Sequence, residues 1–132
     1  MAESAPNIRL LDQAYLDQGF GPSLVITVTL ELEPGSAGSP PHRYSGPVFD
    51  YLVEGELIFE LEGEPERVIR AGEAFWEPGG DVIRYQAANN LTDARAVFVA
   101  VMVCAPDQEM LTYVSAEELA KRAHLRHPRP AV

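Results

Sequence analysis

The feature that most constrains the fold is a series of short segments in which apolar and polar residues alternate, each ended by glycine or proline. In Pro22–Glu33, aliphatic residues alternate with threonine and glutamate, and Glu56–Glu62 repeats the alternation. A period of two gives an extended strand one apolar face and one polar face. The Pro/Gly/Ser-rich residues 34–41 then form a loop. This pattern predicts an all-β domain built as an antiparallel sandwich or barrel.

Three further segments differ from this alternating pattern. Arg95–Ala105 is almost entirely apolar, which predicts a central strand buried on both faces. Ser115 and Glu118 match a capping box, in which two side chains satisfy free amides at a helix start, so we expect a short helix there. Leu10–Gly19 fits either a helical turn or an edge strand, and its pattern does not decide between them.

The length of 132 residues is that of one domain with a real core. We expect residues 1–132 to form that single domain. Its parts are predicted to be a loose N-terminal arm over 1–9, a barrel over 22–114, a helix over 115–124 and a frayed basic tail over 125–132.

Charge and composition exclude several classes of function. The formal net charge of −10 argues against nucleic acid, because phosphate binding needs clustered lysine and arginine. No segment has the cationic start of a secretory signal, and no apolar run reaches the roughly 20 residues of a membrane span. The single cysteine, Cys104, excludes an intrachain disulfide and a thiolate zinc cluster. We expect a cytoplasmic protein with no nucleic-acid or membrane partner.

The candidate functional residues are concentrated in Pro40–Gly55. His42 and Tyr44 are two residues apart, so they share one face of an extended strand. After a Gly-Pro turn, Val48 and Asp50 share a face by the same rule. An acid inside an apolar run is costly to bury without a partner. The pattern therefore predicts that an imidazole, a phenol and a carboxylate meet over one cavity.

Two stretches, residues 35–57 and 72–90, resemble the two sequence motifs of the cupin superfamily. Gly72, Pro78 and Gly80 have the spacing of the second motif, and Gly55 closes the first. The resemblance covers most of residues 24 to 105. It implies a single-domain cupin, that is, a jelly-roll barrel or double-stranded β-helix, here with a short C-terminal helix.

The resemblance also implies where a ligand would lie, because cupins typically hold one divalent metal with three histidines and a glutamate. At those four positions this chain has His42, Tyr44, Val48 and Ile83. One imidazole and one phenol do not supply the three or four donors that iron, manganese or zinc needs. We therefore expect no metal and no other cofactor. A ligand set completed by Asp50 or Glu77 is the alternative.

Acid–base chemistry is the expected replacement for metal chemistry. His42 beside a carboxylate suits general acid–base catalysis, because its ordinary pKa is near neutrality and an acid fixes its tautomer. Tyr44 or Tyr85 would donate a hydrogen bond to a developing enolate or alkoxide. We predict a metal-independent enzyme that isomerises, dehydrates or cyclises a small oxygenated metabolite, with His42, Asp50 and Tyr44 as catalytic residues. Metal-free isomerases and cyclases of the resembling superfamily support this by analogy.

Five further residues are predicted to contact the substrate. They are Tyr85, Glu77, Val48, Ile83 and Trp76. Tyr85 lies two residues beyond the position of the missing histidine, so strand alternation points it into the lumen. Both predicted lumen tyrosines also fit a packing role, and Glu77 also fits a role in bonding turn amides. Arg43 and Arg84 are expected to face outward.

Two other functions stay open at this stage. One is a non-catalytic module that binds a small molecule, which a neutral lumen without a polar network would favour. The other is a metal enzyme with a reduced ligand set. The outward residues Phe49, Tyr51 and Val53 form an apolar stripe that a second subunit would cover, so we expect a homodimer.

Overall fold

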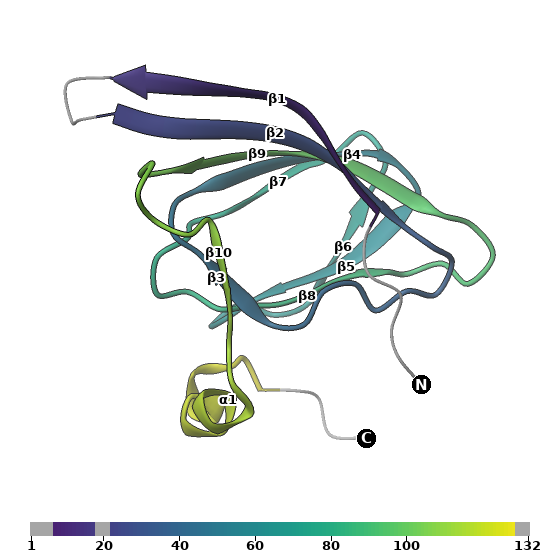
Figure 1. The fold of residues 1–132 in the computed structure, drawn as a ribbon. Coiled ribbons are helices and arrows are strands. Elements are labelled where there is room, and N and C mark those ends of the chain that lie inside the picture. The colour runs from purple at the N-terminus through teal and green to yellow at the C-terminus, as the bar shows by residue number, and fades with distance from the viewer. Residues whose placement is uncertain (1–6, 18–21, 129–132) are drawn as a thin grey trace.

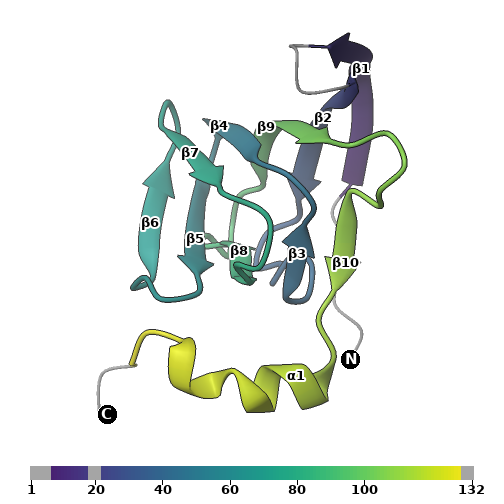
Figure 2. The ribbon, with the colours of Figure 1, turned by 90° about the vertical axis from the view of Figure 1, so that its left-hand side faces the viewer.

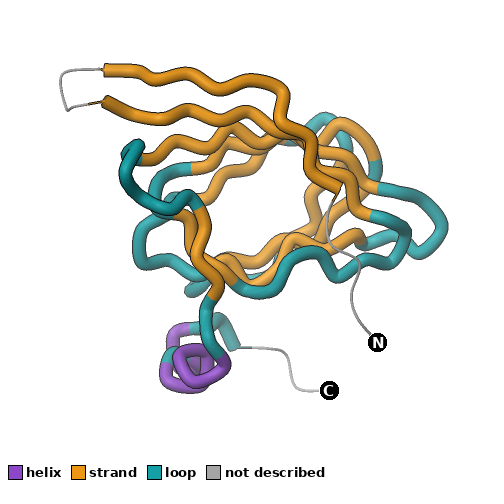
Figure 3. Tube along the Cα trace, in the orientation of Figure 1, coloured by secondary structure: helices purple, strands orange, loops and turns teal. Residues whose placement is uncertain are grey.

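The computed structural model of the chain describes residues 7–17 and 22–128. In this part of the chain, ten strands form two five-stranded antiparallel sheets (Figures 1 and 3). The first sheet has the order β1-β2-β9-β4-β7 and the second β10-β3-β8-β5-β6. The strands are β1 Asn7–Asp17, β2 Pro22–Leu32, β3 His42–Tyr44, β4 Val48–Glu54, β5 Glu56–Leu61, β6 Arg67–Arg70, β7 Ala74–Glu77, β8 Arg84–Asn89, β9 Ala96–Cys104 and β10 Leu111–Tyr113.

The core lies between the two sheets and follows the alternation of the sequence. Buried and exposed residues alternate in β4 from Val48 to Val53 and throughout β7. Phe59, Phe75 and Phe98 pack together through their rings at the centre of the core. The predicted all-β jelly-roll with a C-terminal helix is confirmed. Cys104 is buried, as expected.

Two glycines hold together the turns that carry the candidate site. Gly46, between β3 and β4, packs so tightly on the backbone of β9 that a Cβ would overlap the Val103 carbonyl. Gly79, between β7 and β8, packs directly on Gly46 with a φ of +76°. The Gly80 amide donates to the Tyr44 carbonyl at 2.8 Å. These contacts fix the ends of β3, β4 and β7 relative to one another.

The N-terminal strand begins earlier than predicted. Residues 7–9 were expected in a loose arm, but they pair with β2 in a register that starts at Asn7 and Glu31. The edge-strand reading is the one the structure shows for residues 10–17. Backbone hydrogen bonds to the free edge of β2 select this conformation, although the local pattern is weak. The rest of the predicted arm, residues 1–6, lies outside the described residues.

The C-terminal helix lies across the outer face of the second sheet, from β10 toward β5 and β6 (Figure 2). It comprises α1, Ala116–Lys121, and a 3-10 turn, Ala123–Leu125. The Ser115 hydroxyl accepts from the Glu118 amide at 3.1 Å, which confirms half of the capping box. The Glu118 carboxylate instead accepts from Arg43 at 2.6 Å. Arg43 thus faces outward in a surface ion pair, as predicted.

The segment after the helix is packed rather than frayed, so this prediction is wrong for Arg126. Its guanidinium donates to the buried Glu60 carboxylate at 2.7 Å. It also lies over the Tyr85 ring, 4.2 Å from the ring centroid. A charge partner and an aromatic face on the second sheet hold a segment whose local sequence indicates only a basic tail.

The described part of the chain contains no helix long and apolar enough to cross a membrane. The cytoplasmic location and the absence of nucleic-acid and membrane partners stay predictions.

We predict that Gly46→Ala lowers the free energy of unfolding by about 2 kcal/mol, because the new methyl group overlaps the backbone of β9. Chemical denaturation measures this. Gly80→Ala is the matched control, since Gly80 has a φ of +66° and open space around its Cα. It should lose only about 1 kcal/mol from left-handed strain. Equal losses would contradict the packing role of Gly46.

The homodimer also stays a prediction. Phe49, Tyr51 and Val53 face outward and are 52, 49 and 52 % exposed, and the exposed Trp76 stacks on Phe49. Light scattering should give twice the 14.5 kDa chain mass. Trp76→Glu places a charge on the stripe and should yield a monomer, whereas Leu125→Glu, on the other sheet's side, should not. A monomeric unaltered chain would contradict the prediction.

Candidate functional site

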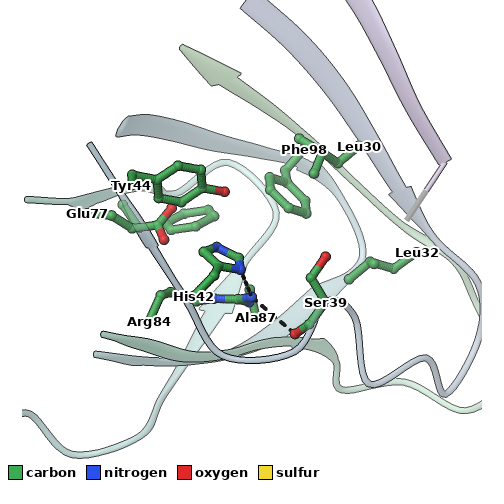
Figure 4. Close-up of a pocket in the computed structure, with 10 residues that line it drawn as sticks. Leu30, Leu32, Ser39, His42, Tyr44, Glu77, Arg84, Ala87 and Phe98 are labelled. Carbon is green, nitrogen blue, oxygen red and sulfur yellow. Dashed lines mark hydrogen bonds between the residues drawn. The ribbon is translucent and has the colours of Figure 1, made fainter. Parts of the chain in front are cut away.

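A small cavity of about 30 Å³ lies between the two sheets (Figure 4). Strands β2, β7 and β9 of the first sheet and β3 and β8 of the second supply most of its wall. One part of the wall is apolar: Leu30, Leu32, Phe75, Ala87 and Phe98. The other part is polar: Ser39, His42, Tyr44, Glu77 and Arg84. This volume holds one or two water molecules or a ligand of a few heavy atoms.

Glu77 on the polar wall and Asp50, which is not among the residues that line the cavity, form a buried carboxyl pair. Val48 on β4 lies directly opposite Glu77 on β7, and Asp50 follows Val48 on the same face, so the two acids are diagonal neighbours. Only 5 % of Asp50 and 6 % of Glu77 are exposed. This neighbour gives Asp50 the partner that its place in an apolar run requires.

The carboxyl pair shares a proton at neutral pH. Burial, the Glu77 charge and a hydrogen bond with Glu77 raise the pKa of Asp50 to about 9, against the opposing charge of Arg84. Burial raises the pKa of Glu77 to about 7, although Arg84 and the Asp50 hydrogen bond act to lower it. The hydrogen bond favours the proton on Asp50 and the charge on Glu77.

Arg84 supplies the positive charge of the cavity, and its predicted outward orientation is wrong. Only 4 % of the residue is exposed, and its Nη2 donates to the Ser39 carbonyl at 3.1 Å. The reason is a β-bulge. The register between β5 and β8 changes from Glu60–Gln86 to Leu61–Arg84, which leaves Tyr85 unpaired. One extra residue exchanges the two faces of a strand, so Arg84 turns inward.

The same bulge moves Tyr85 out of the predicted lumen site. Its ring lies beneath Arg126 on the helix side of the sheet. Trp76 also lies outside the cavity and is 52 % exposed, because Glu77, its neighbour in β7, takes the inward face. Val48 and Ile83 are fully buried but are not among the residues that line the cavity. Of the predicted substrate contacts, the structure places Glu77 on the cavity wall.

His42 lies on the cavity wall but does not form the expected hydrogen bond with Asp50. Its Nδ1 is 2.9 Å from Arg84 Nη2 and 3.0 Å from the Pro40 carbonyl. Burial and the charge of Arg84 lower the pKa of His42 to about 3. The imidazole is therefore neutral at pH 7. Figure 4 shows it between Tyr44 and Arg84.

Tyr44 contributes a neutral phenol to the same wall. Its ring meets the His42 ring edge-on, with 4.7 Å between centroids. Burial and the charge of Glu77 raise the pKa of Tyr44 above its ordinary value. The hydroxyl therefore stays protonated and can donate a hydrogen bond.

These residues do not fit the metal that cupins typically hold. Among the described residues, no group of three or more His, Cys, Asp or Glu side chains is arranged to bind an ion. Asp50 and Glu77 bond each other, and the Arg84 cation contacts the ring nitrogen of His42. A fixed cation and a protonated carboxyl pair oppose the binding of a divalent ion.

The comparisons with known proteins agree with this fold. A family model described as Cupin domain matches residues 28–102, more than half of the 132 residues, and the chain belongs to this family. A search of curated proteins finds no match.

Solved structures with the same fold are distant in sequence. An uncharacterized conserved protein with a double-stranded β-helix domain, from Klebsiella pneumoniae subsp. pneumoniae MGH 78578, is 16 % identical over 87 % of this chain and 89 % of its own, with a TM-score of 0.63. A cupin domain from Bordetella pertussis Tohama I is 19 % identical over 80 % and 99 %, with a TM-score of 0.56. Oxalate oxidase in complex with the substrate analogue glycolate is 21 % identical over 77 % of this chain and 57 % of its own, with a TM-score of 0.55. These likenesses show the fold alone.

Sequence reasoning missed Arg84 and the Asp50–Glu77 bond. Arg84 follows directly after Ile83, which occupies the second-motif histidine position, so alternation from Ile83 excludes it from the lumen. The available signal was electrostatic: two acids placed in the interior need a buried cation. Arg70 and Arg84 are the basic residues nearest in sequence to Glu77, each seven positions away.

We predict that the free energy of unfolding falls as the pH rises from 7 to 9. The folded pKa values of Asp50 and Glu77 lie above the ordinary values of 3.8 and 4.5, so in this range the folded chain holds a proton that the unfolded chain has lost. The loss should be on the order of 1–3 kcal/mol. His42 has the opposite slope, but only between about 3 and its ordinary 6.5.

Denaturant unfolding at pH 7, 8 and 9 measures this dependence. Asp50→Asn removes one titrating carboxyl at nearly constant shape and should flatten the slope. Asp93→Asn changes an exposed acid and should leave the slope intact. A wild-type free energy that is constant or rises over this range would contradict the shared proton.

Proposed function

We propose that the chain is a metal-independent cupin enzyme that moves a proton on a small oxygenated molecule in the cavity. The observation that carries this proposal is the buried, diagonally adjacent Asp50–Glu77 pair beside the buried Arg84. Strongly perturbed carboxyl groups in a cavity with a specific charge partner are typical of catalytic acids and bases. Isomerisation, dehydration and cyclisation of a carbonyl compound all include such a proton transfer.

The proposed role of each residue follows from its protonation state. The Glu77 carboxylate is the general base that removes a proton from the carbon beside a carbonyl group. A pKa near 7 matches this task at neutral pH. The negative charge moves from Glu77 to the enolate oxygen, where Arg84 and the Tyr44 hydroxyl stabilise it. Glu77 then returns the proton to a different atom of the substrate, which completes an isomerisation.

Asp50 and His42 have supporting roles in this scheme. The Asp50 hydrogen bond holds Glu77 in place and sets its basicity. His42 is neutral, so it orients Arg84 through the 2.9 Å contact rather than carrying the proton itself. This assignment replaces the His42–Asp50 pair as the acid–base unit.

A non-catalytic small-molecule-binding cupin is the second candidate. The volume of about 30 Å³ restricts the ligand of either candidate to a few heavy atoms, because small-molecule sites usually enclose several hundred Å³. The charged pair and Arg84 favour the enzyme, because a neutral apolar molecule makes no favourable contact with buried charged groups. Small substrates of three to five heavy atoms satisfy both observations.

Hydrogen–deuterium exchange tests the enzymatic proposal. The purified protein is incubated in D₂O with acetaldehyde, glycolaldehyde or hydroxyacetone, and NMR follows loss of the C–H signal beside the carbonyl. We expect faster exchange than in buffer for at least one compound. Glu77→Gln should reduce that acceleration by about 10²-fold or more, because the base is lost. Glu64→Gln, at an exposed turn, should leave it unchanged.

Metal analysis completes this test. The protein should contain well under one equivalent of transition metal and should keep its exchange activity after dialysis against a chelator. Activity that the chelator removes and added metal restores would overturn the metal-independent scheme. Absence of exchange with all three compounds would favour the binding module.

A further inference from the structure

Two buried nitrogen atoms on the cavity wall have no hydrogen-bond partner among the described residues. They are Nε of Arg84 and Nε2 of His42; among the oxygens of the described residues, Asp50 Oδ2, Glu77 Oε1 and the Tyr85 hydroxyl also lack a partner. Both side chains are almost fully buried, at 4 and 3 % exposed, and both line the same cavity. A buried donor without a partner costs free energy, so each needs a ligand or water within reach.

The contact between the two side chains indicates which nitrogen of His42 carries the proton. A guanidinium group donates hydrogen bonds and accepts none. Its Nη2 lies 2.9 Å from His42 Nδ1, so this nitrogen presents its lone pair. The second hydrogen of Nη2 is shared by the Ser39 and Pro40 carbonyls, at 3.1 and 3.3 Å, so the Pro40 carbonyl, 3.0 Å from Nδ1, has a donor without a proton on Nδ1. The proton of the neutral ring therefore sits on Nε2, which makes it a donor.

The charges around the cavity define the ligand further. Arg84 carries a positive charge, and Glu77 is the acidic residue that lines the same cavity, with Asp50 next to it. Two N–H donors and one fixed cation match the two oxygens of a carboxylate. The neutral phenol of Tyr44 adds a third donor. The apolar side chains on the opposite part of the wall would contact the short hydrocarbon end of such a ligand.

We propose that the cavity binds a small monocarboxylate, whose oxygens accept hydrogen bonds from Arg84 Nε and His42 Nε2. This inference goes beyond the proposed function: it adds a small carboxylate as an anionic ligand of the same cavity, beside the neutral carbonyl compounds on which Glu77 would act. The guanidinium supplies the positive charge that a metal ion provides in cupins that hold one. The volume of about 30 Å³ fits formate or acetate far better than a larger acid.

Side-chain NMR of the intact, ¹⁵N-labelled protein tests this binding. The Arg84 Nε–H resonance is assigned through its own side-chain carbons, and sodium formate is added at constant ionic strength. We expect a saturable shift of the Arg84 and His42 N–H signals, with acetate acting similarly. Formamide, a neutral molecule of the same size, should produce at least tenfold weaker binding. Sodium chloride replaces formate in the ionic-strength control.

Variants check the assignment. Arg84→Gln should weaken formate binding at least tenfold, and Arg84→Lys should retain part of it because the charge remains. Arg70→Gln removes an exposed arginine of the same sheet and should have no effect. If Arg84→Gln does not fold, the wild-type Arg84 signal still decides the question.

Three results would overturn the proposal. They are no saturable shift with formate, equal binding of formamide, and equal shifts at every arginine. The deuterium-exchange experiment remains independent, because its substrates carry no carboxylate. Exchange without formate binding would support an enzyme that acts on neutral substrates. Formate binding without exchange would indicate a carboxylate-binding module.

Discussion

The arrangement of the site depends on the balance of charge between Arg84 and the Asp50–Glu77 pair. Burying an unpaired carboxylate costs several kcal/mol, and two adjacent carboxylates cannot both ionise in a dry interior. One shared proton and one guanidinium bring the local charge to zero. The neutral state of His42 follows from the same balance, because a second cation beside Arg84 would be repelled.

The β-bulge at Tyr85 is the structural device that makes this balance possible. Without the extra residue, strand alternation would direct the Tyr85 ring into the cavity and the Arg84 side chain toward the helix. With it, each side chain finds a suitable partner. Arg84 faces the acids, and Tyr85 faces Arg126. A single irregularity in β8 therefore affects both the interior of the barrel and the docking of the C-terminal segment on its outer face.

The sequence predicted the fold well because the fold depends on short-range patterns. The alternation in β2, β4 and β5 and the glycines of the turns are each readable within a few residues. Ser115 likewise indicated the helix start. The site was predicted only in part. His42, Tyr44, Asp50 and Glu77 lie together, but Arg84 and Tyr85 were assigned to the wrong faces. A bulge depends on the register between β5 and β8, 20 or more residues apart, and local alternation contains no such information.

Under the proposed function, the positive charge of the cavity comes from a different source than in the family's metal site. A divalent metal attracts anionic ligands and needs several deprotonated donors that are not bonded to one another or to a cation. Here one imidazole remains at the four ligand positions, and a side chain from the next position along β8 supplies the charge instead. A guanidinium cannot polarise a substrate as strongly as a metal ion, and it transfers no electrons. It does hold carboxylates and enolates in a defined geometry. The interior charge thus favours proton transfer and anion binding. In both cases the cavity stays neutral, because the carboxyl pair accepts a proton as the negative charge of the enolate or bound anion appears and releases it as that charge leaves.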